Sequence, residues 1–268
     1  MSRTITKTLL RSGLLCTSAF LLPVTAYAAC SDTAPAASSS VTCSGVNTTP
    51  VSAAASDHVS LDVQNGASIV PVSGPAIWLG PSANVTIEQN TVIGNQALAN
   101  NYAVLLGDLS TVTLDGAITS PGGITGPTQG SGSAGLTGAH ITIGETGSIT
   151  TSGNFVNYAI NGHGGSNVYT VNGLIDATTS GIGIGNGDIV NIGATGAINT
   201  SLGTTADAID GFGTTNVTVD MAAGSHITIH GIGRAIQLGA NANVTVGGTI
   251  TSPEDAAVTN SSGGVGVE

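Results

Sequence analysis

Three side chains of this 268-residue chain are of types that perform acid–base chemistry. Asp207 and Asp210 are carboxylates three positions apart, and His163 lies in the stretch NGHGG at 161–165. Two carboxylates that flank a glycosidic bond at roughly 5 to 9.5 Å can act as acid and base, so polysaccharide hydrolysis is the reaction to consider. A lyase reaction on uronates needs clustered cations, and Arg234 is the only Lys or Arg after residue 11.

The Gly-His-Gly of NGHGG resembles a segment of polygalacturonase-like hydrolases. Membership of that family would also require Asn-Thr-Asp, Asp-Asp and Arg-Ile-Lys segments, and the sequence contains none of them. We therefore predict that His163 is a turn residue and that the chain is not an enzyme. A polysaccharide-active, pectin hydrolase-like enzyme is kept as the alternative.

These residues lie within an internal repeat. Five copies begin with Ala and continue alike, as in AIWLGPSANVTI from 76 and AIQLGANANVTV from 235. The ninth residue after the Ala is always Val, namely Val85, Val112, Val168, Val217 and Val244. Asn precedes it in four copies, as Asn84, Asn167, Asn216 and Asn243. The copies start about 22 to 31 residues apart, a period typical of solenoids.

Each copy alternates β-branched and polar residues, which predicts short strands separated by Gly and Asn turns. Such strands can pair with the equivalent strand one repeat away. We therefore predict an all-β, right-handed parallel β-helix, or β-solenoid, of about eight or nine rungs spaced ~4.8 Å apart. The five valines are expected to stack inward, and the four asparagines to form a structural ladder of amides at a corner.

The N-terminus has the layout of a secretory signal. Arg3, Lys7 and Arg11 precede an apolar run, and Ala26-Tyr27-Ala28 provides a cleavage site. We divide the chain into a signal peptide at 1–28, an N-terminal cap segment at 29–55 and a β-helix at 56–268. Cys30 and Cys43 lie within the cap segment and predict a disulfide in an oxidising compartment, with free thiols or an intermolecular bridge as the alternative.

Charge and composition exclude several partners and groups. After residue 28 a single basic residue, Arg234, faces fifteen carboxylates, so nucleic acid and anionic membranes are not expected as partners. His58, His140, His226 and His230 show no metal-ligand spacing, and tandem Gly-Gly-x-Gly-x-Asp repeats are absent. We expect no metal and no cofactor.

The signal, the Cys pair directly after it and the array of NVTV…G-x-I-T rungs together resemble the N-terminal part of an autotransporter (type V secretion) passenger domain from a Gram-negative bacterium. The resemblance implies export, passage across the outer membrane through a C-terminal β-barrel translocator, and display at the cell surface or release.

The resemblance to an autotransporter passenger also implies a non-enzymatic role as an adhesin or structural stalk. The partners would be host or bacterial surface glycans or proteins, or other copies of the chain. Because the repeat runs on to SSGGVGVE without barrel-like strands, we expect the passenger to be truncated at its C-terminal end. A structural spacer without a ligand is a further alternative.

Overall fold

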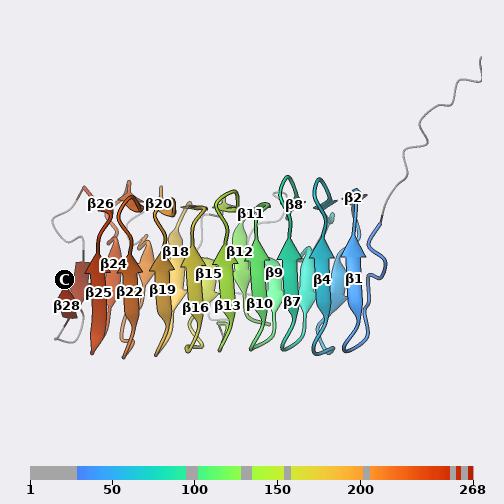
Figure 1. The fold of residues 1–268 in the computed structure, drawn as a ribbon, viewed down its shortest axis with the longest axis horizontal. Helices are drawn as coiled ribbons and strands as arrows, with labels where there is room; N and C mark the ends of the chain where they lie inside the picture. Colours follow the sequence, from blue (N-terminus) through green and yellow to red (C-terminus); the bar gives the residue numbers. More distant parts are fainter. Residues whose placement is uncertain are drawn as a thin grey trace, which may run out of the picture.

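A computed structural model describes residues 29–94, 102–127, 135–153, 158–201, 206–253, 258–260 and 265–267. The predicted signal peptide lies outside the described residues. The described part contains β-strands and no helix, and its strands are stacked along one axis to form a rod (Figure 1). The predicted all-β parallel β-helix is therefore confirmed.

Three parallel sheets run along the rod. Sheet A has ten strands: β1 (Ser40–Cys43), β4 (Ser60–Val63), β7 (Asn84–Ile87), β10 (Thr111–Leu114), β13 (His140–Ile143), β16 (Val168–Val171), β19 (Ile189–Ile192), β22 (Thr218–Met221), β25 (Ala242–Val246) and β28 (Val265–Val267). Sheet B has nine: β2 (Val46–Asn47), β5 (Ser68–Ile69), β8 (Val92–Ile93), β11 (Ala117–Ser120), β14 (Ser148–Thr151), β17 (Leu174–Ala177), β20 (Ala197–Thr200), β23 (His226–Ile229) and β26 (Thr249–Thr251). Sheet C has nine: β3 (Val51–Ala53), β6 (Ile77–Leu79), β9 (Tyr102–Leu106), β12 (Gly122–Thr125), β15 (Tyr158–Gly162), β18 (Ser180–Ile184), β21 (Ile209–Asp210), β24 (Ile236–Leu238) and β27 (Val258–Asn260).

Consecutive strands belong to different sheets, and each pairs with the strands three positions before and after it in the chain. One turn of the winding, here called a coil, therefore contributes one strand to each sheet. Coil 1 contains β1–β3 and coil 9 contains β25–β27, in agreement with the predicted eight or nine rungs. The backbone hydrogen bonds of the sheets run between coils, as the repeat predicted.

The core is a set of apolar rows inside the winding. Sheet B contributes an almost unbroken row of isoleucines in register, namely Ile69, Ile93, Ile118, Ile149, Ile175, Ile198, Ile227 and Ile250. Sheet C contributes a similar row from Val51 to Val258. Alternate residues of sheets A and B point outward and are mostly polar, so the apolar surface is removed from water in one continuous core.

The boundary of the β-helix lies earlier than predicted. Residues 40–53 of the expected cap segment form coil 1, because β1, β2 and β3 pair with β4, β5 and β6. The winding therefore starts at Ser40 instead of residue 56. Among the described residues, only 29–39 act as a cap.

The corner between sheets C and A has one left-handed residue in every coil. These residues are Ser38, His58, Ser82, Leu109, Gly138, Ser166, Gly187, Asn216 and Asn241, with φ between 55° and 71°. Each except the last donates its N–H to the carbonyl of the residue just before the equivalent position in the next coil.

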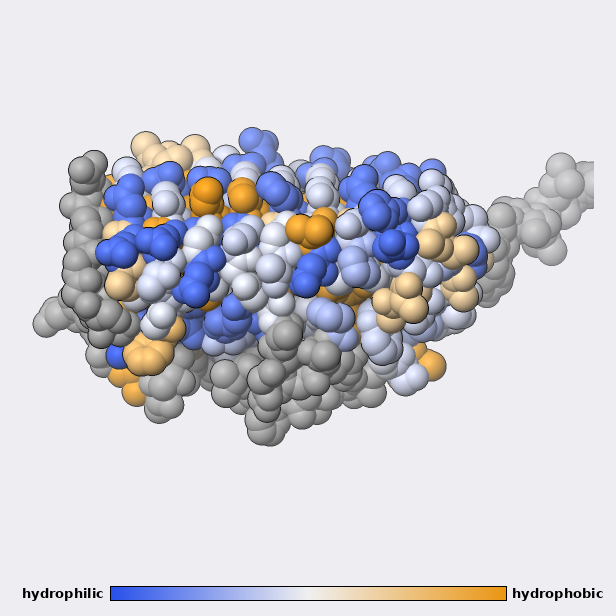
Figure 2. Space-filling view, turned by 90° about the horizontal axis from the view of Figure 1, so that it is seen from below, coloured by the Kyte–Doolittle hydropathy of each residue, from blue (hydrophilic) through white to orange (hydrophobic). Residues whose placement is uncertain are grey.

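Figure 2 views the rod from below and shows a mostly hydrophilic face with small, separated hydrophobic groups.

Candidate functional site on sheet C

The predicted ladder residues do not form one ladder. Val85, Val112 and Val244 belong to one inward row, but Val168 lies one position and Val217 two positions before that row. All but Val168 are almost completely buried, so the four contribute to the common core. The reason for the shift is that the corner between sheets C and A contains one extra residue before Val168 and two before Val217.

The same shift separates the asparagines. Asn84, the first residue of β7, and Asn243, the second residue of β25, are exposed at equivalent places six coils apart. Asn167 is buried one position earlier, and Asn216 is the left-handed corner residue. No two of the four lie at the same place in adjacent coils, so the predicted amide ladder is wrong.

The three candidate acid–base residues lie on or beside sheet C. Tyr158 begins β15 in coil 5, and its hydroxyl donates to Asp210 Oδ2 of β21 in coil 7 at 2.6 Å. His163 follows β15, and its ring meets that of Tyr158 edge-on with centroids 4.7 Å apart. The structure therefore brings His163 and Asp210 to the same Tyr158 side chain.

Gly183 of coil 6 makes this arrangement possible. It lies in register between Asn161 of coil 5 and Asp210 of coil 7. A Cβ added at Gly183 would stand 2.5 Å from His163 Cε1 and 3.0 Å from Tyr158 Cδ1. Because Gly183 has no side chain, Tyr158 of coil 5 can extend across coil 6 to Asp210 of coil 7.

The electrostatics of this cluster follow from burial and from Asp210. Burial lowers the pKa of His163, and the charge of Asp210 offsets part of this effect. Its Nδ1 lies 2.9 Å from Asn161 Oδ1, which can only accept a hydrogen bond, so the proton of the neutral ring belongs on Nδ1. Burial, reinforced by the charge of Asp210, raises the pKa of Tyr158, so its hydroxyl stays protonated as a donor.

Asp207 and Asp210, the carboxylates considered for the alternative of polysaccharide hydrolysis, both accept hydrogen bonds within the protein. Asp207 is buried, its Oδ1 accepts the Arg234 backbone N–H at 2.6 Å, and Arg234 Nη1 lies 3.9 Å from its Oδ2. Asp210 accepts from Tyr158 through Oδ2 and from the Phe212 backbone N–H, at 3.2 Å, through Oδ1. Burial raises the pKa of Asp207, the Arg234 N–H bond lowers it, and the nearby charge of Asp210 raises it further.

A second polar cluster lies inside the winding and was missed by the sequence interpretation. Asp188 is fully buried and accepts hydrogen bonds from the backbone N–H groups of Asn167 and Gly185, at 2.7 and 2.8 Å. The Tyr169 hydroxyl donates to its Oδ2 at 3.3 Å. Asn167 extends this hydrogen-bonded chain to the preceding coil, because its Oδ1 accepts the Ala139 N–H at 2.9 Å.

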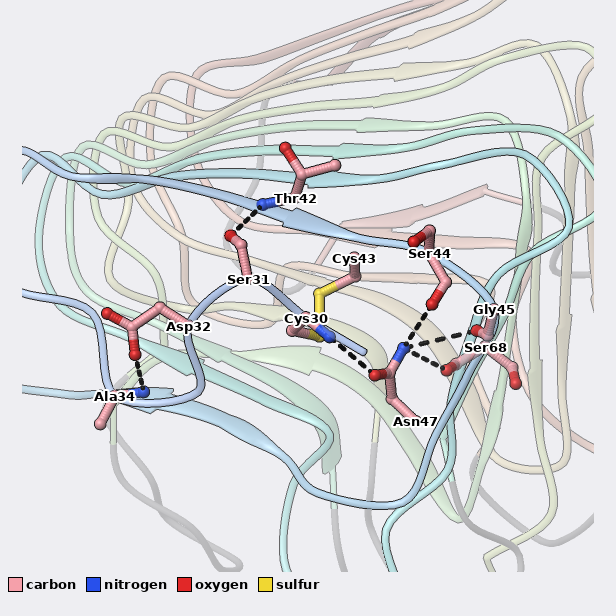
Figure 3. Close-up of a disulfide and its surroundings, with 10 residues drawn as sticks. All are labelled: Cys30, Ser31, Asp32, Ala34, Thr42, Cys43, Ser44, Gly45, Asn47 and Ser68. Atoms are coloured by element: carbon pink, nitrogen blue, oxygen red, sulfur yellow. Dashed lines mark hydrogen bonds between the residues drawn. A yellow bond between two sulfur atoms is a disulfide. The ribbon is translucent and has the colours of Figure 1, made fainter. Parts of the chain in front are cut away.

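The predicted disulfide is present. Cys30 and Cys43 are bonded, and the segment around Cys30 runs antiparallel to β1 across the end of coil 1 (Figure 3). Asn47, at the place that Ile69 holds in the next coil, accepts the Cys30 N–H through Oδ1 at 2.8 Å. A polar residue therefore replaces isoleucine where the core meets the cap.

Within the described ranges, no group of three or more His, Cys, Asp or Glu side chains could hold a metal ion. The described residues also include no helix long and apolar enough to cross a membrane.

Fold and site together define a disulfide-capped parallel β-solenoid with a hydrogen-bonded polar cluster on one sheet. No family model, curated protein or solved structure matches the chain.

Proposed function

We propose that the chain is a non-enzymatic β-helical passenger of an autotransporter-like protein, at the cell surface or secreted, where it acts as an adhesin or structural stalk. The observation that carries this proposal is the combination of three continuous parallel sheets with a disulfide-capped first coil. Such a rod presents long regular faces and resists fraying at its capped end.

The occupied carboxylates support a binding or structural role over hydrolysis. Hydrolysis requires one carboxyl to protonate the leaving group and a second to activate water or attack the sugar. Asp207 is buried against Arg234, and both oxygens of Asp210 accept hydrogen bonds within the protein. Partners would be surface glycans, proteins or further copies of the chain, and the strongly acidic composition disfavours nucleic acid.

A polysaccharide-active enzyme is the second candidate. It is favoured by one observation: a neutral His163 with its proton on Nδ1 would leave Nε2 as an acceptor on a ring that packs against Tyr158, near the charge of Asp210. A general base needs such a free acceptor.

Both candidates can be tested on the full chain expressed with its own signal in a Gram-negative host. We expect the exported protein to begin at Ala29 and either to bind immobilised bacterial or host cells or to aggregate. We expect no release of reducing ends from pectin or other polysaccharides. Failure to bind any surface or to self-associate would contradict the adhesive role and favour the spacer. Release of reducing ends that is lost in His163→Ala would overturn the non-enzymatic proposal.

A further inference from the structure

The turns that join sheet A to sheet B differ in length from coil to coil. Four residues form the turn in five coils, at 64–67, 88–91, 144–147, 193–196 and 222–225. Two residues form it in the others, at 44–45, 115–116, 172–173 and 247–248. The two-residue turn of coil 4 is thus set back between longer turns in coils 3 and 5.

Gly116 is required for the short turn of coil 4. A Cβ at this position would overlap Thr91 Oγ1 of coil 3, and it would stand 2.6 Å from the Glu88 carbonyl oxygen. The longer turn of coil 5 reaches back over the short one, since the Thr146 hydroxyl donates to the Asp115 carbonyl at 2.9 Å. The three turns therefore hold one another in fixed positions.

A pocket of about 230 Å³ lies at this step. Gln89, Asn90 and Thr91 of coil 3 form one wall, residues 115–117 of coil 4 form the floor, and Thr146 of coil 5 forms the opposite wall. Pockets for drug-sized ligands usually start at roughly 300 Å³, so this one suits a group of about one sugar ring.

The same step recurs at coil 6 with one informative difference. Asn172 and Gly173 form its short turn, and the Thr195 hydroxyl of coil 7 donates to the Asn172 carbonyl at 2.7 Å. The position of Ala117 is held there by Leu174, because both pair in register with Ser148. Ala117 therefore keeps the coil 4 step open where a leucine would occupy it, and the fold accepts leucine at this place.

The lining offers hydrogen-bonding groups of both kinds and no cation. The amides of Gln89 and Asn90 donate and accept, the Asp115 carboxylate accepts, and the Ala117 methyl supplies a small apolar surface. We propose that this pocket binds one residue of a neutral, hydroxyl-rich saccharide, with its hydroxyls on the amides and Asp115 and a C–H face on Ala117. The proposed adhesive function enters only for the source of the saccharide, a surface glycan.

Charge disfavours an anionic sugar, and the number of carboxylates disfavours Ca²⁺. Asp115 lines the pocket, and Glu145 belongs to the flanking turn of coil 5, so an anionic sugar would meet like charges. Asp115 is the only carboxylate in the lining, whereas a Ca²⁺ site usually takes six to eight oxygen ligands.

The test is a titration of the full exported chain with methyl glycosides of glucose, galactose, mannose and N-acetylglucosamine, and with glucuronate and Ca²⁺ alone. Ala117→Leu fills the pocket with the side chain that coil 6 carries. Ala197→Leu is the matched control, because Ala197 lies in the same row at coil 7, three coils away. Thermal unfolding of both variants checks that the fold is kept.

We expect at least one neutral glycoside to bind, Ala117→Leu to weaken that binding tenfold or more, and Ala197→Leu to leave it unchanged. Binding that survives Ala117→Leu, binding of only glucuronate or Ca²⁺, or no binding at all would overturn the inference. Adhesion of the unmodified chain separates the two proposals, because a chain that adheres but binds no neutral glycoside would overturn the pocket inference and leave the adhesive function standing.

Discussion

Asp188 Oδ1 accepts the backbone N–H of Asn167 at 2.7 Å, which joins coil 7 to coil 6 inside the winding. Asn167 and Ser110 occupy the equivalent place in coils 6 and 4, and each accepts the N–H of an alanine in the preceding coil, Ala139 and Ala83. A side-chain oxygen thus satisfies a backbone N–H at the corner, where an unpaired buried donor would be costly.

Stability should depend on pH through Asp188. Burial raises its pKa from 3.8 to about 6, although hydrogen bonds from Asn167, Gly185 and Tyr169 offset part of this effect. The folded state therefore holds the proton more tightly than the unfolded chain. The contribution of Asp188 to the free energy of unfolding is fully present below pH ~4. It is lost as the pH rises to about 6, by up to about 3 kcal/mol.

Urea denaturation between pH 4 and pH 7 measures this loss, and the midpoint should fall with rising pH. Asp62 and Asp207, whose pKa values are also raised by burial, contribute with the same sign. Asp188→Asn should flatten most of the slope, and an unchanged slope would show that Asp188 is not its source.

Removal of the disulfide should loosen the capped end. Cys30→Ser with Cys43→Ser, or reduction of the unmodified chain, should cost about 3 kcal/mol on the loop-entropy model. Because each coil contacts only its neighbours, amide exchange should speed up in β1 and remain slow in β13 and β16. Equal acceleration along the whole rod would argue against a local cap.

The left-handed corner predicts two opposite effects. Gly187 has φ 71°, and an added Cβ would make only an ordinary contact with Ser166 Oγ at 3.8 Å, so Gly187→Ala should cost about 1 kcal/mol from backbone strain alone. Leu109 has φ 61° and is 65% exposed, so Leu109→Asn should raise stability by roughly 0.5 kcal/mol. Thermal unfolding of the two variants measures both effects, and shifts of the same sign would contradict this account of the corner.

The cluster on sheet C depends on the empty place at Gly183. Gly183→Ala should displace the His163 and Tyr158 rings and cost about 1 to 3 kcal/mol. Adding His163→Ala should recover part of this loss, because the closest contact is with His163 Cε1. A double-mutant cycle by urea denaturation tests the coupling, and strict additivity would mean that the ring was not displaced.

The sequence predicted the fold because the repeat carries it: period-two strands, Gly corners and a copy spacing that matches one coil. Val85, Val112 and Val244 were placed correctly in one row for this reason. Val168 and Val217 were misplaced because extra corner residues shift the register without changing the local pattern of the strand.

The polar clusters were less predictable. Asp188 lies in GNGD, a stretch that matches surface loops as well as it matches a buried corner. Tyr158 meets Asp210 across two coils and 52 residues, a proximity that the register of the sheets determines and local sequence does not. The pocket beside Asp115 depends on differences in turn length between neighbouring coils, which become visible only once the coils are aligned.

The stacking of coils is the claim on which every functional statement depends. Thr86 and Thr245 occupy the same outward row of sheet A, in coils 3 and 9, with Thr142 between them in coil 5. Spin labels at Thr86 and Thr245 should give a separation near 29 Å, and labels at Thr142 and Thr245 one near 19 Å, from ~4.8 Å per coil. A Thr142–Thr245 separation as long as the Thr86–Thr245 separation would contradict the solenoid.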